Sequence, residues 1–156
     1  YKNCRDRIQN GECLETLETM ITNQSGDPAV IEDYSRFPEA SEEYVVEAEE
    51  DGWVNSIDAY DIGMGSKSLG AGRETMDSEL DYGAGIELHR KVGDEVRSGD
   101  RVATLKYNKD VSPDTAKQRV LEAYEIHSKQ PEERPLVFSR LTSDGTLVEL
   151  DKNRPE

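Results

Sequence analysis

The sequence contains few of the residues from which small metal and redox sites are built. Its 156 residues include two cysteines, Cys4 and Cys13, and two histidines, His89 and His127. Two cysteines make neither a disulfide framework nor a zinc-ligand set, so we expect a reducing, cytoplasmic environment. With so few ligands of this kind, the sequence predicts no metal site and leaves little material for a catalytic triad.

Positive charge and long apolar runs are also scarce. Lysine and arginine number 19 against 34 aspartates and glutamates, which gives a formal net charge of −15. Such a chain repels phosphate backbones and anionic lipid, so we expect neither nucleic acid nor a membrane surface as a partner. No apolar run approaches the roughly 20 residues that a transmembrane helix needs. The length is typical of about one domain.

The first 32 residues are predicted to be helical. Tyr1, Cys4 and Ile8 repeat at helical spacing, and Gly11 follows where a helix commonly ends. Because this pattern starts without an N-cap, it predicts a piece cut from a longer chain; a processed N-terminus is the alternative. Both cysteines are expected to be small apolar residues on helix faces rather than reactive thiols.

A second helix is predicted over residues 12–24, and Asp27-Pro28 is an N-cap followed by proline at the first position of a short helical turn. The apolar stripe of the second helix consists of Leu14, Leu17, Met20 and Ile21. We expect exposed apolar residues near Leu14, Leu17 and Ile21 to drive association.

Between residues 43 and 108, short β-branched segments alternate with turn signals. Strands are predicted over residues 44–48, 53–57, 86–89 and 101–105. Asp51-Gly52 is a hairpin signal, so the first two strands are expected to pair with each other. Asp58 can cap a short helix that ends at Ile62. The acidic run over residues 39–51 is expected to be a solvated strand edge.

The remainder of the chain predicts a late helix and a terminal hairpin. Ser112 and Pro113 form a helix start, and Ser143-Asp144-Gly145 is a turn between strands at residues 136–139 and 146–150. The apolar face of the helix is predicted to consist of Ala116, Val120, Ala123, Tyr124 and His127. The fold class is therefore predicted to be α+β: N-terminal helices, a mixed β-sandwich of barrel-sandwich or hammerhead type, then this helix and hairpin.

Four glycines, at positions 63, 65, 70 and 72, are predicted to share one loop region. Gly70-Ala71-Gly72-Arg73 could form a backbone nest for an anion, with Arg73 adding charge. It does not match a dinucleotide fingerprint, because Thr75 replaces the third glycine, and Lys67 does not directly follow a glycine as in a P-loop. Glycines that only turn the chain are the alternative. The candidate site residues are Gly70, Gly72 and Arg73.

Residues 92–105 resemble the hairpin segment of biotinyl and lipoyl carrier domains. A carrier needs an exposed lysine at a tight turn between two strands, and neither Lys106 nor Lys109 is predicted at such a turn. The carrier function is thus not predicted. Because the resemblance of the hairpin segment remains, a stand-alone carrier-like interaction module is an alternative interpretation of the chain. A small anion-binding protein that uses residues 70–73 is another.

A wider resemblance covers residues 1 to about 140. Leu69-Gly70-Ala71-Gly72-Arg73, then Asp81, Gly85-Ile86-Glu87-Leu88-His89 and Lys91-Val92-Gly93-Asp94 resemble the C-terminal region of pyrimidine-nucleoside phosphorylases, which include thymidine phosphorylases. Residues 26–28, 51–54, 57–59 and 62–63 also resemble that family. The sequence departs from the family at residues 64–68, which replace a more apolar helix, and at Ala84.

The resemblance implies a function for a longer parent protein. Family members are homodimers that split pyrimidine nucleosides with phosphate into the free base and a pentose 1-phosphate, without a cofactor. Their phosphate-binding and base-binding residues lie in the N-terminal two-thirds, so the resemblance assigns no catalytic or substrate-binding residue to this chain. It implies that residues 1–40 belong to the large domain of the parent, that residues 41–141 form a β-rich C-terminal domain, and that residues 142–156 form a hairpin or tail. Gly70, Gly72 and Arg73 are expected to face the cleft.

Overall fold

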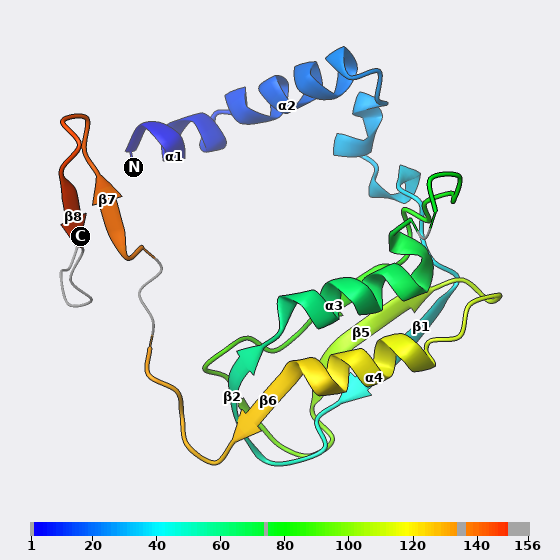
Figure 1. The fold of residues 1–156 in the computed structure, drawn as a ribbon. Coiled ribbons are helices and arrows are strands. Elements are labelled where there is room, and N and C mark those ends of the chain that lie inside the picture. The colour runs from blue at the N-terminus through cyan, green and yellow to red at the C-terminus, as the bar shows by residue number, and fades with distance from the viewer. Residues whose placement is uncertain (1, 74, 134–136, 150–156) are drawn as a thin grey trace.

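The computed structural model describes residues 2–73, 75–133 and 137–149 (Figure 1). In chain order the elements are α1 (Lys2–Gln9), α2 (Glu12–Asn23), η1 (Pro28–Ile31), η2 (Tyr34–Arg36), β1 (Glu42–Glu47), β2 (Gly52–Ile57), α3 (Ala59–Ser66), η3 (Lys67–Ala71), β3 (Gly85–Leu88), β4 (Glu95–Val96), β5 (Arg101–Tyr107), α4 (Asp114–Ala123), β6 (Tyr124–His127), β7 (Ser139–Leu141) and β8 (Leu147–Glu149). Helices and antiparallel strands occur together, which confirms the expected α+β class. None of the helices in these residues has the length and apolar character needed to cross a membrane.

Two three-stranded antiparallel sheets enclose the core. One has the order β1-β5-β3 and the other the order β4-β2-β6. In the central strand β5, the consecutive residues 102–105 are all buried, so both faces of this strand are covered. Such a strand is apolar without alternation, as the sequence Val-Ala-Thr-Leu is. The acidic strand β1 lies at an edge, as expected for the run over residues 39–51.

Helices α3 and α4 run side by side against this core (Figure 1). Ala116 and Val120 of α4 are fully buried. Gly65 of α3 is buried, and a Cβ there would lie 3.2 Å from Cδ1 of Ile86 in β3 and at ordinary contact distance, 3.5 Å, from the carbonyl oxygen of Ala116 in α4. At the surface of the pair, an Arg119 guanidinium nitrogen lies 2.5 Å from Oδ1 of Asp61.

The expected hairpin between the first two strands is wrong. β1 pairs with β5, whereas β2 pairs with β4 and β6, so the two strands lie in different sheets. Asp51 does not close a turn with Gly52; its Oδ1 accepts a hydrogen bond from the amide of Ser98 at 2.7 Å. The pairing of β1 continues instead to Ala48, whose carbonyl accepts from the amide of Gly99 at 2.8 Å. These long-range contacts carry the chain across to the second sheet.

The late helix ends earlier than its apolar spacing predicts. Ala123 is the last residue of α4, and Tyr124 and His127 belong to strand β6, which pairs with β2. Tyr124 is buried and Ile126 half-buried, whereas His127 is exposed, as the two-residue period of a strand requires. The prediction failed because a spacing of three to four residues cannot separate a helix end from a following strand when both bury the same side.

The predicted glycine loop is also corrected. Gly63 and Gly65 lie inside α3, which Asp58 caps by accepting hydrogen bonds from the amides of Tyr60 and Asp61. The helix runs past the expected end at Ile62 and continues into the π-helical turn η3.

The N-terminal helices form as predicted but bury no residue. Gly11, with a φ of +88°, separates α1 from α2. Leu14, Leu17 and Met20 on α2 are 54%, 45% and 52% exposed, and Ile21 is half-buried. Tyr1, the first residue of the expected stripe on the opening helix, lies outside the described residues. The apolar stripe of α2 therefore lies largely in the solvent.

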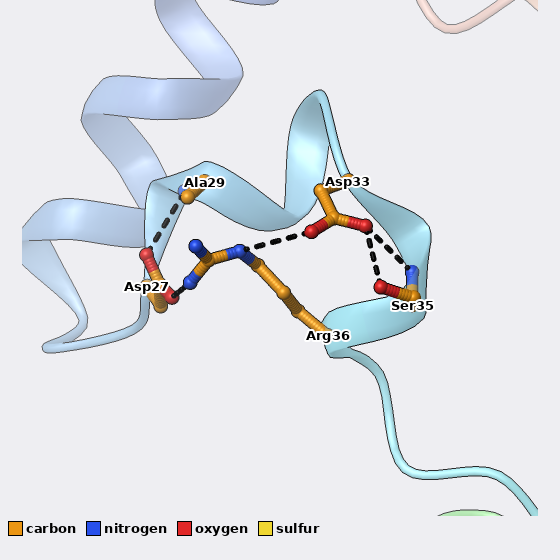
Figure 2. A network of polar contacts seen from close by, with 5 residues as sticks. All are labelled: Asp27, Ala29, Asp33, Ser35 and Arg36. Atoms are coloured by element: carbon orange, nitrogen blue, oxygen red, sulfur yellow. Dashed lines mark hydrogen bonds and ion pairs between the residues drawn. The ribbon is translucent and has the colours of Figure 1, made fainter.

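A small polar network lies at η1 and η2, at the end of the helical part of the chain (Figure 2). Asp27 accepts a hydrogen bond from the amide of Ala29 at 3.0 Å, which is the predicted N-cap. Figure 2 shows the Arg36 side chain reaching between two carboxylates, with Nη1 at 2.7 Å from Asp27 and Nε at 3.5 Å from Asp33. The Ala29 amide and then the Arg36 guanidinium hold the pKa of the Asp27 carboxyl below its usual value. This network fixes η1 against η2, ahead of the connector to β1.

The terminal hairpin is confirmed with shifted limits. β7 pairs with β8 across the turn that contains Gly145, which has a φ of +84°. Val137 and Phe138 precede the strand rather than belonging to it, and both are exposed. The other predicted strand residues at 136 and 150 lie outside the described residues.

Candidate functional site

The glycine-rich segment 70–73 begins within η3 and continues beyond it. Gly70 has a φ of +107°, and a Cβ there would lie 3.2 Å from Cβ of Asp81. The left-handed backbone favours glycine, and a Cβ would in addition crowd Asp81. Gly72 is extended, and a Cβ on it would meet Cγ of Lys67 at 2.8 Å. Arg73 is exposed. Of the predicted site residues, the structure thus packs Gly70 and Gly72 against neighbours and leaves Arg73 at the surface.

Asp81 connects this segment to the sheet. Its amide donates to the carbonyl of Gly70 at 3.0 Å, and its Oδ1 accepts from the amide of Gly83 at 2.9 Å. Oδ2 of Asp81 accepts from Nδ2 of Asn108, directly after β5, at 2.6 Å. Oδ1 of Asn108 in turn accepts from the amide of Ser41, directly before β1, at 3.0 Å. Four segments far apart in sequence therefore meet at two residues, Asp81 and Asn108.

Sequence reasoning found only part of this cluster. Asp81 was among the residues that carry the family resemblance, but Asn108 and Ser41 were not singled out. An asparagine directly after a strand is typical of a turn. No local pattern indicates that Asn108 binds Asp81, 27 residues away in the sequence.

The other residues considered from the sequence have structural roles. Nε2 of His89 lies 2.7 Å from the hydroxyl of Thr104, which is buried. Lys106 lies within strand β5, 3.4 Å from Glu87, and Lys109 lies 3.7 Å from Glu42. Lys106 is thus not at a tight turn of the carrier type. Lys109 does lie in a turn, but this turn joins β5 to α4 rather than two strands.

Neither a thiol nor a metal-ligand cluster is part of the site. Cys4 lies on α1 and Cys13 on α2, and both are free and exposed. Within the residues that the structure describes, no group of three or more histidine, cysteine or carboxylate side chains could hold a metal ion.

Two surface depressions are unsuited to a phosphate dianion, as far as the described residues line them. Those residues are Asp94, Glu132 and Glu133 in the depression beside Gly93, with no lysine or arginine among them. The described lining of the other, between α2 and η1, is acidic and apolar and includes no basic side chain. Phosphate needs converging cationic or amide donors, and carboxylates repel it.

Comparison with known proteins finds similarity to one group of enzymes. Residues 53–127 match the family model described as the pyrimidine nucleoside phosphorylase C-terminal domain. The pyrimidine-nucleoside phosphorylase of Geobacillus stearothermophilus is 33% identical over 135 residues, which are 86% of this chain and 31% of that protein. That of Bacillus subtilis (strain 168) is 40% identical over 103 residues, 66% of this chain and 24% of that protein. That of Staphylococcus haemolyticus is 36% identical over 124 residues, 80% and 28% respectively.

The fold and the cluster around Asp81 define an α+β domain with a tightly held glycine-rich turn. Residues 53–127 belong to the family of pyrimidine nucleoside phosphorylase C-terminal domains. The matched segment begins within β2 and ends with β6, so it includes the glycine-rich segment, Asp81 and Asn108. The chain spans less than a third of the length of these curated relatives.

Proposed function

We propose that this chain is the supporting C-terminal part of a pyrimidine-nucleoside phosphorylase. The observation that carries the proposal is the match to the C-terminal domain family, by a chain that spans 31% of the Geobacillus stearothermophilus enzyme. In the parent reaction a phosphate oxygen attacks C1′ of the nucleoside. The bond from C1′ to the base nitrogen breaks, and the base takes up a proton as it leaves. Phosphate and nucleoside are bound by the rest of the parent, which is a cytoplasmic homodimer.

The chain by itself is inactive in this proposal. The depressions near Gly93 and beside α2 offer carboxylates where phosphate would need cations. The exposed stripe of α2, with Leu14 and Leu17, is covered in the parent by its large domain, to which residues 1–40 belong. Residues 41–141 form the supporting C-terminal domain.

The glycine-rich segment has a separate part in the proposal. Gly70, Gly72 and Arg73 face the cleft of the parent, where the exposed Arg73 contributes positive charge near phosphate as the enzyme closes. Arg73→Ala in the parent enzyme is expected to change kcat or the KM for phosphate. Unchanged kinetics would remove this role and leave the supporting role untouched.

The test of the main proposal is phosphorolysis by the purified 156-residue chain. Uridine and thymidine are incubated with phosphate, and release of free base is followed by chromatography. The Geobacillus stearothermophilus enzyme under the same conditions is the positive control. We expect base release from the control and none from the chain above the rate without protein. Turnover by the chain would contradict the claim that the substrate-binding residues lie elsewhere.

A further inference from the structure

We propose that Asp81 and Asn108 are a positioning pair that couples the glycine-rich segment to the connector between the N-terminal helices and β1. The pair deepens the proposed function, on which it rests only for its consequence in catalysis: it would set where the cleft-facing segment lies. The coupling itself is a property of this chain and is testable without any substrate.

Asp81 and Asn108, through one backbone amide and two side chains, hold several segments of the chain together. Asp81 holds the segment at Gly70 through its amide and the loop at Gly83 through its carboxylate. Asn108 holds the amide of Ser41, the last residue of the connector, which comprises residues 37–41. The bond of 2.6 Å between the two side chains closes the chain of contacts. A displacement of the connector is therefore transmitted to Gly70 through three hydrogen bonds.

The loop at Gly83 packs closely against the backbone of the connector. A Cβ on Gly83 would lie 2.7 Å from the carbonyl carbon of Glu39 and 2.8 Å from the amide nitrogen of Ala40. These are backbone atoms, which cannot rotate away as a flexible side chain would. The loop that carries Asp81 thus lies directly on the connector. The two segments must move together or lose this contact.

The two side chains differ in which hydrogen bonds they can donate and accept. A carboxylate accepts hydrogen bonds and cannot donate them, whereas an amide does both. Asp81 accepts from Gly83 and from Asn108, and Asn108 donates to Asp81 and accepts from Ser41. Exchanging the two residues retains every one of these bonds, because asparagine at 81 would accept from Gly83 and donate to aspartate at 108. In Asp81→Asn alone, an amide donor at position 81 or 108 is left facing another donor. In Asn108→Asp alone, two carboxylates face each other.

The test is a double-mutant cycle with Asp81→Asn, Asn108→Asp and the double exchange, read by amide hydrogen exchange. Each single variant loses the charge-assisted hydrogen bond between the side chains at positions 81 and 108. We therefore expect the amides of Ser41 and Gly83, which these side chains hold, to exchange about tenfold faster. In the double variant protection returns to within about threefold of the original chain. The amide of Gly93, bonded to Val54, is the internal control and stays unchanged in all variants.

Asp110→Asn is the matched control for Asp81→Asn, because it removes the same negative charge at an exposed position two residues from Asn108. It should leave the amides of Ser41 and Gly83 unchanged. The proposal is overturned if the single exchanges leave both amides protected, or if the double exchange remains as unprotected as the singles. Should a single variant not fold, recovery of folding in the double variant supports the pair, and failure of the double variant to fold overturns it. None of these outcomes depends on phosphorolysis, so the pair and the proposed function fail independently.

Discussion

At the scale of single residues, the best-defined polar group in the core is the hydroxyl of Tyr124. It donates towards the carbonyls of Arg90, at 3.0 Å, and Val102, at 3.2 Å, so it ties β6 to β5 and to the segment after β3. Burial, followed by the negative charge of Asp94, raises the pKa of Tyr124 to about 12. The unfolded chain has the ordinary value of 10.0.

This difference predicts a loss of stability at high pH. Between pH 10 and 12 the unfolded state releases the phenol proton and the folded state keeps it, so the free energy of unfolding falls as pH rises. Urea unfolding across this range, for the original chain and for Tyr124→Phe, measures the effect. We expect a shallower fall in the phenylalanine variant. Equal slopes for the two proteins would show that Tyr124 ionises like an exposed tyrosine.

At the scale of elements, sequence patterns predicted local structure better than pairing. The two N-terminal helices, the cap at Asp27 and the turn at Gly145 were all predicted, because each depends on a few neighbouring residues. The partner of β1 and the end of α4 were not. Both depend on β5 and β2, which lie dozens of residues away from them in the chain.

The burial of elements predicts opposite outcomes for two leucine substitutions. Leu69 in η3 is fully buried, whereas Leu14 in α2 is 54% exposed. Leu69→Ala is expected to cost about 2–5 kcal/mol of the free energy of unfolding, because it leaves a cavity beside the glycine-rich segment. Leu14→Ala should change it by less than about 0.5 kcal/mol. Urea unfolding followed by the fluorescence of Trp53, the only tryptophan, measures both. A Leu14→Ala effect as large as that of Leu69→Ala would mean that α2 is packed in this chain.

At the scale of the whole molecule, stability is concentrated in the sheets and the α3–α4 pair. The core cluster draws its residues from β1, β2, β4, β5, η3, α4 and β6. Helices α1 and α2 contain no buried residue, and their contacts are chiefly with each other and with η1. Figure 1 shows them extending away from the sheets.

This distribution predicts two levels of protection against hydrogen exchange. Amides of α2 should exchange on the order of a hundredfold or more faster than those of β5, because opening α2 exposes little apolar surface. Exchange measured by mass spectrometry on peptides from both segments, with the urea-unfolded chain as the reference for full exchange, provides the comparison. Similar protection in α2 and β5 would show that the helices share the stability of the core.

The sequence by itself determined the charge balance, the α+β class, the helix caps and turns, and the resemblance to pyrimidine-nucleoside phosphorylases. These properties reside in residue types and in spacings of a few positions. Only the tertiary structure decided that β1 and β2 lie in different sheets and that Asn108 meets Asp81 and Ser41. The physical reason is that strand pairing and hydrogen bonds between residues far apart in the chain are selected by the whole fold at once, among partners that no local pattern distinguishes.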